Sequence, residues 1–119
     1  MEEETVTLFR PTGALELELV RRSGWKRWPP RLREQPIFYP VTNELYARDI
    51  ASRWNATESG AGYVTRFRVR TSFMNEFAIQ CVGAAHHTEW WIPAERLEEL
   101  NDNIVGEIEL IASYEVATE

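Results

Sequence analysis

The sequence predicts a single domain of the α+β class. Segments with strand alternation and segments with helical periodicity follow one another, without the regular strand–helix–strand rhythm of an α/β protein. We expect about six strands, in a mixed or mostly antiparallel sheet, together with about three helices. The 119 residues are enough to bury one hydrophobic core. We therefore treat residues 1–119 as one domain.

The composition indicates a folded chain in a reducing compartment. Apolar residues make up 44% of the sequence, which includes five Trp, five Phe and four Tyr. The single cysteine, Cys81, excludes an internal disulfide. No apolar run approaches the roughly 20 residues of a membrane-spanning helix, and the acidic residues 2–4 do not suit a signal peptide. We therefore expect a cytoplasmic protein.

Charge and motifs exclude several classes of function. The net charge of −6 argues against general affinity for duplex nucleic acid, because such binding needs an excess of Lys and Arg. The chain contains neither the Gly-x-Gly-x-x-Gly fingerprint nor a P-loop. It also lacks the nucleophile-elbow motif of Ser-His-Asp hydrolases.

The first half of the chain predicts two strands and two helices. Residues 5–10 favour a strand that Arg10 closes, and residues 36–41, bounded by prolines, favour a second. Residues 14–22 alternate Leu and Glu as a strand would, but their propensities favour a helix, which we predict. The clearest helical pattern follows Asn43, a good N-cap. Its apolar positions are Tyr46, Ala47, Ile50, Ala51 and Trp54.

Arginines concentrate in two other segments. Residues 25–35 form a basic and aromatic loop, and long loops of this kind are often functional. Residues 63–70 alternate cleanly, with three arginines on one strand face. These are Arg66, Arg68 and Arg70. Such a row can clamp a diphosphate, or it can pair with glutamates of a neighbouring strand, for which the last strand, at 105–116, supplies candidates.

Residues 86–91 contain two histidines, a carboxylate and two tryptophans. We expect a short strand over 88–92, followed by a helix. On a strand Glu89 shares a face with His87 and Trp91, so the three can form a site; alternatively, Glu89 is a rim carboxylate beside half-buried aromatics. Because neighbouring strand residues point to opposite faces, the two histidines are not expected to share a metal ion.

The order of these residues resembles the ADP-ribosyltransferase-like fold. In that fold an Arg or His on the first strand, a Ser or Tyr on a central strand and a Glu on a late strand line a cleft for NAD. The sequence is also similar to a family of small bacterial proteins labelled "ADP-ribosylation/crystallin J1". The similar segments are Gly24-Trp25, Pro29-Pro30-Arg31-Leu32, Gln35-Pro36-Ile37-Phe38-Tyr39-Pro40-Val41, Gly62-Tyr63-Val64-Thr65-Arg66-Phe67 and Trp91-Ile92-Pro93-Ala94-Glu95. ADP-ribosyl glycohydrolases bind magnesium through aspartate clusters that do not occur here, so that activity is not expected.

The transferase resemblance implies catalytic roles for Arg10, Tyr39 and Glu89. Arg10 would hold the ribose or phosphate of NAD, and Glu89 would bind the ribose 2′-hydroxyl and stabilise an oxocarbenium-like transition state. The expected NAD-binding residues are Arg10, Tyr39, Arg66, Arg68, His87 and Trp91. The chain departs from the family pattern at Tyr39-Pro40-Val41, where many members have Ser-Thr-Ser, and at His87, where Glu or Gln is associated with modifying protein side chains. Arginine in proteins is therefore not the expected acceptor.

Two main classes of function remain open. The first is an NAD-consuming enzyme that transfers ADP-ribose to an unknown acceptor or hydrolyses NAD. The second is a non-catalytic module of the same fold that binds a nucleotide, a nucleic-acid end or a protein through a cleft between Arg10 and Glu89. In that cleft we expect Arg10 and one of the three strand arginines to contact a diphosphate. A third possibility is a protein-binding adaptor that uses exposed tryptophans.

Overall fold

The computed structural model describes residues 4–55 and 60–115, and it confirms an α+β domain. The described strands are β1 (Thr5–Thr12), β2 (Ile37–Phe38), β3 (Ala61–Arg70), β4 (Ile79–Cys81), β5 (Thr88–Trp90), β6 (Ile92–Pro93) and β7 (Ile104–Glu115). The α-helices are α1 (Ala14–Arg22), α2 (Glu44–Ile50), α4 (Thr71–Met74) and α5 (Leu97–Asp102). All strand pairings among these residues are antiparallel. None of the described helices combines the length and apolar character needed to cross a membrane.

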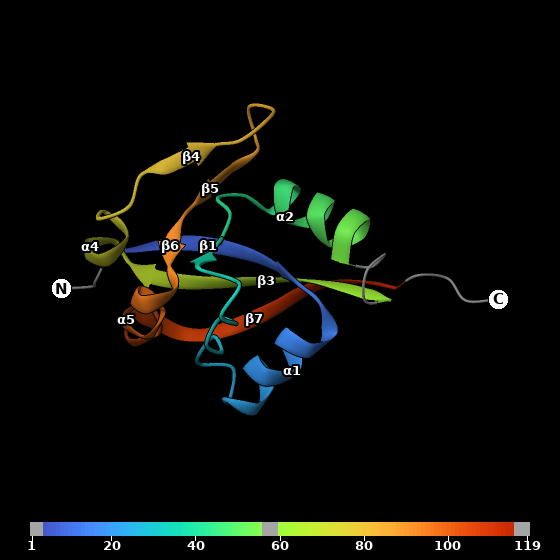
Figure 1. Ribbon diagram of the computed structural model, residues 1–119, viewed down its shortest axis with the longest axis horizontal. Helices are drawn as coiled ribbons and strands as arrows, with labels where there is room; N and C mark the ends of the chain where they lie inside the picture. Colours follow the sequence, from blue (N-terminus) through green and yellow to red (C-terminus); the bar gives the residue numbers. More distant parts are fainter. Residues whose placement is uncertain (1–3, 56–59, 116–119) are drawn as a thin grey trace.

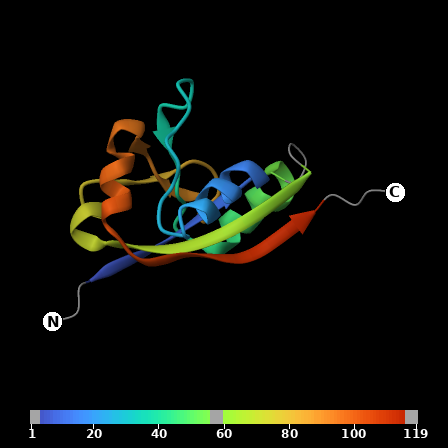
Figure 2. The same ribbon diagram turned by 90° about the horizontal axis from the view of Figure 1, so that it is seen from below.

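The main sheet has the order β1-β3-β7, with β3 at its centre (Figure 1). Neighbouring side chains of β1 point to opposite faces of the sheet, and they belong to two separate apolar clusters. Leu8 packs with Val20 of α1 in the larger apolar cluster, whereas its neighbour Phe9 packs against Ala47 of α2 in the smaller one. Helices α1 and α2 therefore cover opposite faces of this sheet. Helices α4 and α5 lie together at the end of the sheet where β1 begins (Figures 1 and 2).

A glycine marks an irregularity in the pairing of β3 with β7. The register shifts between Arg66 and Arg68, close to Gly106, whose φ is +82°. A Cβ at Gly106 would lie 3.3 Å from Nη2 of Arg68. Because side chains disfavour this backbone region, glycine is the residue that fits the bulge without strain.

Both helices predicted in the first half of the chain form. Helix α1 begins at Ala14, and its buried residue is Val20. Helix α2 is capped by Asn43, whose Oδ1 accepts the N–H of Tyr46 at 2.8 Å. The helix continues as a π-helical turn over Ala51–Asn55. On the predicted apolar face Ala47 and Ala51 are fully buried and Tyr46 and Ile50 are partly buried, while the side chain of Trp54 lies outside the described part of the chain.

The strand predicted over 36–41 is shorter in the structure, and its end has a separate role. Strand β2 covers Ile37–Phe38 and pairs with β6. Beyond it Val41 forms isolated antiparallel bridges with Phe9 of β1 and with Glu89 of β5. Val41 thus joins the main sheet to the β4–β5 hairpin, and this junction sets the orientation of Glu89.

Candidate functional site

Arg10 is buried on the α1 face of the sheet, in a bidentate ion pair. Its Nε and Nη2 donate to the carboxylate of Glu16 at 2.5 and 2.8 Å. Its Nη1 donates to the carbonyl oxygen of Tyr39 at 3.3 Å. The guanidinium carbon lies 4.4 Å from the ring centroid of Phe38. Packing and pairing therefore fix the orientation of the Arg10 side chain.

Arg31 brings a second guanidinium to the same carboxylate. Its Nη1 lies 3.6 Å from Oε1 of Glu16, and its side chain is 12% exposed. Its Nε is buried and has no hydrogen-bond partner among the described residues. Burial, followed by the nearby charge of Arg10, lowers the pKa of Arg31. Two guanidinium groups thus share one carboxylate, which leaves a surplus of positive charge.

A groove of about 270 Å³ opens beside Arg31 and Glu16, between α1 and the loop that precedes β2. We call it the arginine groove. Its lining is mostly apolar and includes Leu15, Leu19, Pro30, Arg31, Leu32 and Phe38. Leu15 and Leu32 are largely exposed. The groove suits a ligand that joins an apolar or planar group to an anion.

Glu89 lies on the other side of the sheet, and it is buried rather than solvated. It is 8% exposed. The hydroxyl of Tyr46 donates to its Oε1 at 3.0 Å, and the indole N–H of Trp91 donates to its Oε2 at 2.8 Å. Burial, together with the hydrogen bond to Glu89, raises the pKa of Tyr46 to about 12. Two donors therefore hold the carboxylate in one orientation.

The structure does not bring Arg10 and Glu89 together. Residues paired across antiparallel strands point to the same face, so Phe9, Val41 and Glu89 all face α2. Arg10, next to Phe9, points to the α1 face. Tyr39 contacts Arg10 through its backbone carbonyl, and its side chain is exposed. The expected cleft between Arg10 and Glu89 is not formed.

The row of strand arginines is also separate from Arg10. Arg66 pairs with Phe9 and points to the α2 face, where its Nε lies 3.3 Å from Oε1 of Glu109 on β7. This is the pairing with a glutamate of the last strand that the sequence offered as an alternative. Arg68 points to the face of β3 opposite to that of its neighbour Phe67, and it lies beside Gly106. A diphosphate held jointly by Arg10 and this row is not supported.

The two histidines lie in the turn between β4 and β5, because β5 begins only at Thr88. The expectation that they point to opposite faces of a strand is therefore wrong. The ring of His87 stacks on Tyr46, with centroids 4.7 Å apart. Through Tyr46, His87 is contiguous with Glu89 and Trp91. The expected residues His87, Glu89 and Trp91 thus form one connected cluster on the α2 face.

Several residues of these clusters were not predicted. Arg31 lies in the basic and aromatic loop that composition had marked as a functional candidate. Glu16 and Tyr46 carried no such signal, because on a helix they look like an ordinary surface acid and an ordinary core aromatic. No protein-family model, curated protein or solved structure matches this chain.

Proposed function

We propose that this protein is a cytoplasmic nucleotide-binding module that holds NAD or ADP-ribose in the arginine groove. The proposal depends on one observation: Arg10 and Arg31 share the carboxylate of Glu16, and Nε of Arg31 has no partner among the described residues. Buried charge is stable only when it is paired. A phosphate group of the ligand would balance the surplus positive charge of the two arginines, because guanidinium and phosphate match in geometry.

The groove is suited to part of a nucleotide. Its volume of about 270 Å³ is close to the lower end of the range for small-molecule sites, which begins at about 300 Å³. It would therefore take a phosphate with the neighbouring ribose or base, while the rest of the ligand extends over the surface. The exposed rim residues Leu15 and Leu32 offer apolar contact to that part.

Thermal shift and isothermal titration calorimetry with ADP-ribose, NAD and adenosine test this proposal. ADP-ribose at about 100 times its Kd should stabilise the wild type by about 2.7 kcal/mol. Arg31→Met should remove this effect and keep the apolar volume. Arg33→Met is the matched control, because Arg33 belongs to the same loop and is exposed. Adenosine, which lacks phosphate, should bind much more weakly.

Two results would overturn the nucleotide proposal. One is the absence of any shift with ADP-ribose or NAD. The other is equal affinity for ADP-ribose in wild type and Arg31→Met, which would place the ligand elsewhere.

A second candidate, an NAD-consuming transferase or hydrolase, is favoured by the environment of Glu89. A buried carboxylate with two fixed donors can stabilise the positive charge that develops on the ribosyl group as nicotinamide leaves. In this case the substrate would lie on the α2 face, beside Tyr46, His87 and Trp91, and Arg10 would take no part. The two candidate functions therefore differ in where NAD would bind as well as in the chemistry.

Nicotinamide release tests the second candidate. If the candidate holds, Glu89→Gln should lower the rate by a factor of about 10² to 10³, because it removes the charge that stabilises the transition state. Equal non-zero rates would exclude Glu89 from the mechanism. Binding of NAD without release by either protein would leave the binding module as the function.

A further inference from the structure

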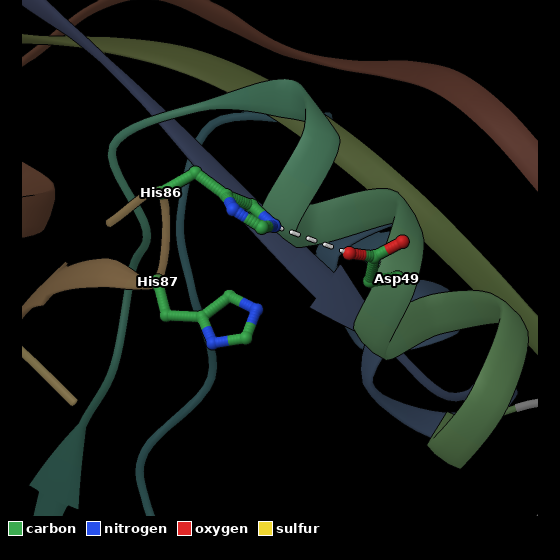
Figure 3. Close-up of side chains that lie close together, drawn as sticks. All are labelled: Asp49, His86 and His87. Carbon is green, nitrogen blue, oxygen red and sulfur yellow. Dashed lines mark hydrogen bonds and ion pairs between the residues drawn. The ribbon is translucent and has the colours of Figure 1, made fainter. Parts of the chain in front are cut away.

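The α2 face carries a second cluster of chemically active groups, formed by Asp49, His86 and His87. Figure 3 shows the carboxylate of Asp49 on α2 facing the two imidazoles of the β4–β5 turn. The donor atoms of the three residues all lie within 4.8 Å of one another. The chain contains only two histidines, and both are here. We propose that this histidine cluster binds a divalent transition-metal ion of the zinc class.

The spacing of His86 and Asp49 suits a shared ion better than a direct hydrogen bond. Nε2 of His86 lies 3.5 Å from Oδ2 of Asp49, at the outer limit for a hydrogen bond. Tetrahedral zinc with bonds of about 2.0–2.1 Å places neighbouring donor atoms about 3.4 Å apart. Nε2 of His86 and Oδ2 of Asp49 are therefore already about as far apart as two ligand atoms of one zinc ion. Donor atoms within 4.8 Å of one another have to approach by at most about 1.4 Å to reach that separation, and the half-buried side chain of His87 can move by this much.

Two contacts hold the turn in place against α2. Nδ2 of Asn43, the N-cap of α2, donates to the carbonyl oxygen of His86 at 2.7 Å. The ring of His87 stacks on Tyr46. At Gly83 an added Cβ would lie 2.5 Å from Nδ1 of His87, so the turn needs a residue without a side chain there. The imidazoles are thus positioned by the fold.

The hydrogen bonding of His87 predicts how the turn responds to the ion. The N–H of Ala84 donates to Nδ1 of His87 at 3.0 Å, so in a neutral ring the proton is on Nε2. Coordination through Nε2 moves that proton to Nδ1, which then needs an acceptor. A rotation of the peptide between Gly83 and Ala84 would present the Gly83 carbonyl oxygen. Ligating histidines usually donate their second N–H to such a group.

The donor set defines the class of ion. Two imidazole nitrogens and one carboxylate oxygen suit Zn²⁺, Co²⁺ or Ni²⁺, whereas Mg²⁺ and Ca²⁺ prefer oxygen ligands throughout. Three protein ligands leave a coordination position for water or a small ligand. The cluster lies on the face opposite the arginine groove, so its occupancy can be tested independently of nucleotide binding.

The test is titration of the tag-free, chelator-treated full chain with Zn²⁺ by calorimetry and with Co²⁺ by visible absorbance. We expect one ion per chain, and at least tenfold weaker binding in His86→Ala, His87→Ala and Asp49→Asn. Gly83→Ala keeps every ligand but displaces His87, and it should weaken binding by a factor of about 10 to 100.

Cys81 provides the matched control, because it is an exposed thiol close to the same turn. Cys81→Ser should keep the wild-type affinity, and a loss of binding in that variant would overturn the proposed ligand set. In nuclear magnetic resonance spectra the two imidazoles of the chain and the Ala84 amide should all shift on addition of Zn²⁺. The proposal fails if there is no saturable binding of one ion per chain, or if both histidine variants bind as the wild type does.

Discussion

Asn101 at the end of α5 holds the segment around Trp28 through two buried hydrogen bonds. Its Oδ1 accepts the backbone N–H of Trp28 at 2.8 Å, and its Nδ2 donates to the Trp28 carbonyl oxygen at 3.0 Å. Asn101 is 4% exposed. The indole of Trp28 packs against Phe38 and Phe67 in the larger apolar cluster. Asn101→Ala would therefore leave one buried donor and one buried acceptor of the main chain unpaired.

The expected loss of stability follows from these two groups. A buried polar group without a partner costs about 1–3 kcal/mol, so two of them give about 2–6 kcal/mol. This is a large part of the roughly 5–15 kcal/mol that stabilises a typical domain. At about 4 °C per kcal/mol for a chain of this size, Tm should fall by about 8–24 °C. Urea unfolding followed by far-ultraviolet circular dichroism measures the change in the free energy of unfolding.

Asn103→Ala is the control. Asn103 follows the same helix, and its side chain donates one exposed hydrogen bond, to the carbonyl oxygen of Glu99. Its loss should cost no more than about 0.5 kcal/mol. The reasoning is refuted if Asn101→Ala costs less than about 1 kcal/mol, or no more than Asn103→Ala, since water would then satisfy the Trp28 backbone.

Three further predictions concern single positions. Asn43→Ala removes the cap of α2 and should lower the free energy of unfolding by about 1 kcal/mol; an unchanged urea midpoint would contradict this. Gly106→Ala forces a side chain into a φ of +82° and should cost about 1–2 kcal/mol in the same assay, and a neutral effect would show that the bulge relaxes. Folding raises the pKa of Tyr46 from its ordinary value of 10.0 to about 12. Its contribution to stability is therefore complete below pH 10 and is lost as the pH rises to about 12. The wild type should therefore lose stability more steeply than Tyr46→Phe over that range, and parallel pH profiles would show that Tyr46 is not protected from ionisation.

Features that depend only on neighbours along the chain could be predicted from the sequence. Asn43 and the apolar spacing after it predicted a capped helix, because a cap and a helical face are both complete within a few residues. The alternation of residues 63–70 predicted the central strand for the same reason. The pairing of Arg66 with Glu109 was one of two alternatives that this alternation left open.

Which candidate side chains meet depends on contacts between distant segments, which the sequence pattern does not encode. Arg10 and Glu89 are on opposite faces because Val41 bridges Phe9 and Glu89, a pairing between three distant segments that no local pattern encodes. The histidines can face Asp49 because β5 begins at Thr88, and a strand that began two residues earlier would have separated them. The charge surplus at Arg31 likewise arises from the packing of its loop onto α1. For Arg10 and Glu89 a one-residue change of strand register would reverse the direction of the side chain, and that register is set by contacts across the fold.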